Sequence, residues 1–224
     1  KTKLDYDASS RANLTIKLAS PYIPIIDTVA VPHLQGKLSK DYLEILPKFI
    51  LKYDFDKNSF VYFSASRGYK AGGYNIQGFA DILSDAMKNE VMSLMPGSET
   101  TEIDVESIID YDPEYTWNYE FGGQIDIVKN TLAMNFALFY IDVTDIHITD
   151  FVESGSGRIT KNAGRAVSKG FELGLKARPC TGFYLYANYG FSDAKFKNKE
   201  LMGKHTSFAP ESTLALGANI SVNF

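Results

Sequence analysis

Cysteine is almost absent from this sequence: Cys180 is the only one among 224 residues. One cysteine excludes an internal disulfide framework and any metal site built from cysteines. Long apolar runs are also missing, since no segment approaches the roughly 18 consecutive apolar residues of a transmembrane helix. An excess of positive charge is missing too: the formal net charge is -4, which argues against a nucleic-acid partner.

Aromatic residues, in contrast, are abundant. The chain has 14 Tyr and 15 Phe beside a single Trp, and such rings gather in girdles at membrane interfaces. The 45% hydrophobic content would suit a soluble protein. A transmembrane barrel has a similar average, because half of its strand residues face a polar lumen. Composition alone therefore leaves both classes open.

Residues 112–142 predict a β-hairpin that turns at Lys129 and Asn130. Apolar residues occupy every second position of both halves, which gives each strand one apolar face without charge. Strands of about 9–11 residues tilted by about 45° can cross a bilayer, so the hairpin indicates a transmembrane barrel. The expected apolar face comprises Tyr119, Phe121, Ile125, Ile127, Leu132, Met134, Phe136, Leu138 and Tyr140.

The same alternation recurs along the chain and predicts about eight strands. Their connections are long and short in strict alternation, as in outer-membrane barrels, which have short periplasmic turns and long external loops. The pattern places the long segment 76–111 outside the cell and Phe224 at the periplasmic rim. The predicted strands are residues 12–18, 44–55, 60–70, the two halves of 112–142, 165–178, 183–192 and 212–224.

The long connections carry weaker signals. Residues 1–10 show no clear periodicity, and residues 20–42 contain three prolines, with at most a short extended piece at 25–31. Within 76–111, apolar residues from Phe79 to Met87 recur at helical spacing, which predicts a helix that ends before Pro96. This helix is either a lid that faces a ligand or a loop that packs on itself. Residues 143–164 and 193–210 are predicted to be loops.

Four motifs, in this order, resemble the barrel of TonB-dependent outer-membrane receptors. They are SRGYKAGGYN (66–75), PE followed by NYEFG (113–122), NFALFY (135–140), and NAGRA leading to GFELG (162–174). The resemblance implies an all-β fold, here about eight strands of an antiparallel barrel of about 22. We therefore expect residues 1–224 to be an excised part of one such barrel domain, with the plug outside this sequence and no closed pore formed by the chain alone.

The resemblance also implies a function. Members import a scarce nutrient, such as a ferric siderophore, haem, cobalamin or an oligosaccharide, with energy from the TonB system. The expected partners are TonB through the plug, a small-molecule nutrient and outer-membrane lipid. No cofactor and no enzymatic activity are expected.

The candidate ligand contacts lie at the outer end of the strand that begins at residue 60. Arg67, Lys70, Tyr74 and Asn75 could meet an anionic chelate, or they could be interfacial side chains that snorkel and girdle aromatics. The three histidines, His33, His147 and His205, are expected at the surface, because none has the orienting partner of a haem ligand. The acidic run 99–110 lacks EF-hand spacing, and a solvated loop is the better hypothesis.

Two other architectures remain open at this stage. Eight strands can close by themselves, so the chain could be a complete small outer-membrane barrel acting as an adhesin or an enzyme, although it has no Gly-x-Ser-x-Gly elbow or paired nucleophile and base. It could also be a soluble lipocalin-like carrier. Pairing of residues 12–18 with 212–224 would indicate closure at eight strands, whereas two separate edges would favour the receptor.

Overall fold

The computed structural model describes residues 1–16, 26–94, 102–152, 155, 157–199, 201–207 and 209–221. The chain divides into two compact units. Unit 1 comprises Lys1–Leu43, Ala71–Asp112 and His147–Asn162, and unit 2 comprises Glu44–Lys70, Pro113–Ile146 and Ala163–Phe224. In the part of the chain that is described, none of the helices has the length and apolar character needed to cross a membrane.

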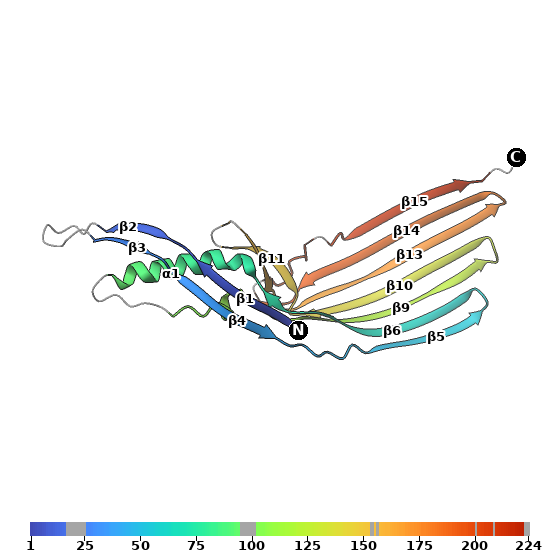
Figure 1. Ribbon diagram of the computed structural model, residues 1–224. Helices are drawn as coiled ribbons and strands as arrows, with labels where there is room; N and C mark the ends of the chain where they lie inside the picture. The colour runs from blue at the N-terminus through green and yellow to red at the C-terminus, as the bar shows by residue number, and fades with distance from the viewer. Residues whose placement is uncertain are drawn as a thin grey trace. The chain divides into compact units, whose positions relative to one another are not determined.

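Unit 2 is one antiparallel sheet of seven strands in the order β15-β14-β13-β10-β9-β6-β5 (Figure 1). The order of the strands in the sheet is also their order in the chain, so the sheet is a meander. Short turns join the strands at one end, here called the turn end, and long connections leave at the other, the loop end. The strands are β5 (Lys48–Asp56), β6 (Ser59–Lys70), β9 (Glu114–Val128), β10 (Leu132–Thr144), β13 (Ala166–Cys180), β14 (Phe183–Phe196) and β15 (Ser212–Ile220).

The register of the sheet separates an apolar face from a polar face. One continuous row crosses six strands on the apolar face: Leu51, Phe63, Phe121, Leu138, Phe171 and Phe191. All six of these side chains are exposed. Soluble monomers rarely expose so large a contiguous apolar surface, so this face requires apolar surroundings.

Unit 1 combines two-stranded sheets with helices. Its elements are β1 (Thr2–Ser9), β2 (Ala12–Ile16), β3 (Ile26–Ala30), β4 (His33–Lys40), β7 (Gly73–Tyr74), η1 (Ile76–Gly78), α1 (Phe79–Ser93), α2 (Val105–Ile109), β8 (Asp110–Tyr111), β11 (His147–Phe151) and β12 (Arg158–Asn162). The strand pairs are β1 with β4, β2 with β3, β7 with β8, and β11 with β12.

A small hydrophobic core holds unit 1 together. Ile82 of α1 and Ile109 of α2 are fully buried, and Val105 lies beside them. The β1 and β4 strands present alternate side chains to this core, among them Leu4, Tyr6, Leu34 and Leu38. Period-two alternation on β1 and β4 and helical spacing on α1 therefore converge on the same core.

The structure confirms seven of the predicted strands and the helix, and it corrects the rest. Residues 12–16 are not a barrel strand, because β2 pairs with β3 and not with β15; positions 17 and 18 lie outside the described residues. The segment 1–10, predicted to be irregular, forms β1, and 20–42 contains β3 and β4. The two segments predicted to be loops, 143–164 and 193–210, contain β11 and β12 and the last residues of β14, respectively.

The sheet edges decide between the architectures left open by the sequence. Among the described residues, β5 and β15 are the two edges of the seven-stranded sheet and do not pair with each other. Closure at eight strands through residues 12–18 is therefore wrong. Two of the predicted positions, Pro96 after the helix and Phe224 at the periplasmic rim, lie outside the described residues.

Candidate functional site

The polar face of the sheet has few charges along its central row. Its central row runs from Lys52 through Tyr62, Gly122, Ala137, Glu172 and Gly190 to Thr213. A groove of about 580 Å³ lies along this face. Gln124, Asn135 and Asn188 bring amide groups to it, and Glu172 is the only charged residue among the described residues that line it.

Glycines create room for aromatic rings on this face. A Cβ atom at Gly122 would lie 2.8 Å from the hydroxyl oxygen of Tyr62, and one at Gly170 would lie 2.7 Å from the ring of Phe139. The rings therefore lie across the glycines of the neighbouring strand, an arrangement known to stabilise glycine-containing strands. The hydroxyl of Tyr62 donates a hydrogen bond to the carboxylate of Glu120. The groove can thus hydrogen-bond a polar partner, and its negative charge favours donors over anions.

Arg67 and Lys70, both predicted ligand contacts, lie on opposite faces of β6. Arg67 faces the apolar side beside Trp117; its guanidinium lies 4.8 Å from the ring centre of Tyr115 and 3.7 Å from a carboxylate oxygen of Glu44. Lys70 lies on the polar side, where its Nζ is 2.7 Å from Oε1 of Glu114. The carboxylate of Glu114 is only 5% exposed, whereas Lys70 is 65% exposed.

Tyr74 and Asn75, the other two predicted contacts, belong to unit 1. Tyr74 packs against the hydrophobic core, with the ammonium of Lys40 5.9 Å from its ring centre. Both polar atoms of the Asn75 side chain bond to the backbone of Thr160, at 2.9 and 2.7 Å. The four residues are therefore not one cluster: Arg67 and Lys70 are held within unit 2, and Tyr74 and Asn75 within unit 1.

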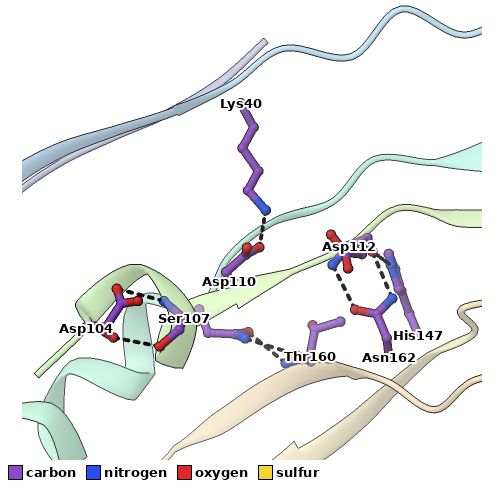
Figure 2. Close-up of polar contacts among 9 residues, drawn as sticks. Lys40, Asp104, Ser107, Asp110, Asp112, His147, Thr160 and Asn162 are labelled. Carbon is purple, nitrogen blue, oxygen red and sulfur yellow. Dashed lines mark hydrogen bonds and ion pairs between the residues drawn. The ribbon is translucent and has the colours of Figure 1, made fainter.

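A second polar cluster, which the sequence did not predict, surrounds Asp112 (Figure 2). The side chain of Asn162 bonds both backbone groups of Asp112, at 2.8 and 2.9 Å. The Nε2 of His147 lies 2.7 Å from the carbonyl oxygen of Asp112, and its ring packs edge-on against Tyr111 at 5.2 Å. Since a carbonyl oxygen can only accept, Nε2 carries the proton of this bond.

An ion pair adjoins this cluster. The ammonium of Lys40 contacts the carboxylate of Asp110 (Figure 2), and the two side chains are 19% and 26% exposed. Partial burial lowers the pKa of Lys40, but the hydrogen bond and the charge of Asp110 outweigh that effect and hold this pKa above its ordinary value of 10.5. Lys40 is thereby kept charged, and it ties β4 to β8.

The histidines and several residues of the acidic run have partners within the described part of the chain. No group of three or more His, Cys, Asp or Glu side chains converges there. His33 pairs with Asp7 at 2.6 Å, and His205 pairs with Glu211 at 3.3 Å. Residues 105–109 of the acidic run form α2 instead of a solvated loop, and the Asp104 carboxylate caps its N-terminus by accepting from the backbone of Ser107 at 3.3 Å; positions 99–101 lie outside the described residues.

Comparison with known proteins gives a consistent result. Residues 25–224 match the family model described as "TonB dependent receptor-like, beta-barrel". The fold is similar to the ferric yersiniabactin uptake receptor FyuA from Yersinia pestis, with 20% identity and a TM-score of 0.57 over 89% of this chain and 25% of that one. It is also similar to the ferripyoverdine receptor of the outer membrane of Pseudomonas aeruginosa, with 15% identity and a TM-score of 0.51 over 88% of this chain and 22% of that one. The chain thus spans about a quarter of the length of these receptors.

Proposed function

Because the chain belongs to the TonB-dependent receptor family of the outer membrane, we propose that it forms part of a receptor that imports a scarce chelated nutrient, such as a ferric siderophore. In this proposal unit 2 is a section of the barrel wall, and residues 1–224 belong to a single barrel domain. Energy comes from the TonB system through a plug domain outside this sequence.

The observation that carries the proposal is the two-faced meander of unit 2. Its apolar face is uncharged across the middle rows of all seven strands, and its polar face holds the amide-lined groove. Lipid on one side and a polar lumen on the other satisfy both faces at once. The two edge strands find partners in further strands of the same barrel, because unpaired backbone groups are too costly in hydrocarbon.

The alternation of connections sets the orientation that we propose. The turns after β5, β9 and β13 are short and face the periplasm, whereas the connections after β6, β10 and β14 are long and face the exterior. The segments Ala71–Asp112 and His147–Asn162 of unit 1 are then external loops. External loops are where such a receptor meets its ligand.

Arg67, Lys70, Tyr74 and Asn75 remain our proposed ligand contacts. Lys70 has the most exposed charged group of the four, and an anionic chelate could replace Glu114 as its partner. Arg67 is less available, because Glu44 and Tyr115 already surround its guanidinium. We expect Lys70→Ala to weaken chelate binding more than the same change at Lys48, which lies exposed on β5.

Uptake by intact cells tests the proposal. The full-length receptor is expressed in a Gram-negative host that lacks its own siderophore receptors, and accumulation of radioactive iron is measured with catecholate, hydroxamate and carboxylate chelates. We expect uptake of one class, dependent on TonB. Uptake that persists without TonB would contradict the energy coupling. Failure to accumulate any chelate or other nutrient, together with adhesion to surfaces, would favour the adhesin alternative.

A further inference from the structure

Asn75 and Thr160 belong to two connections that leave the sheet at different places, yet they are joined by a complete amide pair. The Nδ2 of Asn75 donates to the carbonyl oxygen of Thr160 at 2.9 Å, and the backbone N–H of Thr160 donates to Oδ1 of Asn75 at 2.7 Å. The side-chain amide therefore takes the place of a backbone peptide group in a β ladder. These two residues are 85 positions apart in the chain.

Asn162 makes the reciprocal pair. Its Oδ1 accepts from the backbone N–H of Asp112 at 2.8 Å, and its Nδ2 donates to the carbonyl oxygen of Asp112 at 2.9 Å (Figure 2). In the first pair, Ala71–Asp112 supplies the side chain and His147–Asn162 supplies the backbone. In the second pair the roles are exchanged. We call the two pairs the amide clamps.

Further bonds connect the same two segments. The backbone N–H of Arg158 donates to the side-chain oxygen of Gln77, and His147 donates to the same Asp112 carbonyl that Asn162 uses. Asn75 is in turn fixed by its own backbone N–H, which donates to the carbonyl of Ile109 at 2.7 Å. Each clamp is thus anchored on both sides, to β12 on one segment and to the ends of β7 and β8 on the other.

We propose that the amide clamps couple Ala71–Asp112 and His147–Asn162, so that these two external segments open and rearrange as one body. The coupling belongs to the fold of unit 1 and holds for any ligand of the receptor. A ligand that contacts either segment then acts on the conformational equilibrium of both, because a coupling free energy between two sites is reciprocal. The body includes α1, which is covalently part of the first segment and contributes Ile82 to the hydrophobic core of unit 1.

Hydrogen exchange of single amides in the full-length receptor in detergent tests the coupling. The variants are Asn75→Ala and Asn162→Ala, and the control is Asn219→Ala, which changes an exposed asparagine of β15. Loss of a clamp should raise exchange at the backbone N–H that donates to its asparagine by at least about fivefold, since two hydrogen bonds of modest net strength are removed. The coupling predicts, in addition, a several-fold rise at the other clamp: Asn75→Ala at Asp112, and Asn162→Ala at Thr160.

The double variant provides the second measurement. If the segments move as one body, the rise in exchange rate in the double variant is smaller than the product of the two single rises, because loss of one clamp has already released both segments. Exchange confined to the mutated clamp, or two effects that multiply independently, would overturn the proposal. Asn75→Asp extends the test should the alanine variants fold poorly, because it retains the acceptor for Thr160 N–H and replaces the donor with a carboxylate oxygen that repels the Thr160 carbonyl. The heat-dependent gel shift of the barrel confirms that each variant is folded.

Discussion

Leu138 tests which face of the sheet meets lipid. It lies at the middle of β10 in the apolar row between Phe121 and Phe171, and 54% of its surface is exposed. Arginine near the bilayer midplane of a barrel costs about 2–4 kcal/mol. Leu138→Ala should cost only about 1 kcal/mol, roughly half the value of a fully buried leucine, because about half of the side chain packs on protein. The difference between the two variants isolates the cost of the charge.

The assay is refolding of the full-length receptor into lipid vesicles across a urea series, with the folded fraction read from the gel shift. Glu172→Arg is the matched control, since Glu172 lies on the polar face opposite the neighbouring Ala137. We expect the free energy of unfolding to fall by about 2–4 kcal/mol for Leu138→Arg and by much less for Glu172→Arg. Equal losses would refute the assignment of faces.

Three further outcomes are expected. A cysteine in place of Ser84, which is exposed on α1 within the Ala71–Asp112 loop, should react with an impermeant maleimide in intact cells. Cys180, which is exposed at the turn end, should react only after the outer membrane is broken. Labelling of Cys180 but not of position 84 in intact cells would contradict the proposed orientation. Gly170→Ala should lower stability in urea by about 1–3 kcal/mol, because its Cβ collides with the backbone of β14, whereas Gly68→Ala has room and should be nearly neutral. Hydrogen bonds from the ammonium of its lysine partner on β12 and from a backbone N–H hold the pKa of Asp150 below its ordinary value of 3.8. Protection of the β11 and β12 amides from hydrogen exchange should therefore be present above that pH and decline as the pH falls below it. The same pH profile of protection in Asp150→Asn would contradict this.

The sheet was predictable because its constraint is local. On each strand of unit 2, successive side chains point to the apolar face and to the polar face of the sheet. The alternation of apolar and polar residues is therefore visible in the sequence, as at Phe121 beside Glu120. The turns carry equally local signals: Asn130 adopts a positive φ of 60°, which asparagine tolerates better than most residues. Pairing of β5 with β6, β9 with β10 and β13 with β14 then follows from the short turns, whereas the other three pairings of the sheet span the long connections.

Unit 1 was harder because its strands use residues with low strand propensity. In β1, Leu4, Tyr6 and Ala8 alternate with Lys3, Asp5 and Asp7, and the structure shows the matching alternation of burial. The pattern was missed because aspartate is uncommon in strands and the segment has only eight residues. β11 and β12 are only five residues each and carry charged side chains, so their strand structure depends on pairing with each other.

The amide clamps mark the limit of sequence reasoning for the candidate site. Asn75 lies in a motif from which we predicted ligand contacts, and in the structure its side-chain amide binds a backbone group 85 positions away. Nothing near Asn75 or Asn162 in the sequence encodes this partner, because an asparagine can pair with any peptide group that the fold brings to it. What the sequence does contain is the reason for the choice of residue. Among short side chains only an asparagine can donate and accept side by side, as a strand would, so an asparagine at the neck of a long loop is a candidate for such a clamp wherever two loops leave a sheet close together.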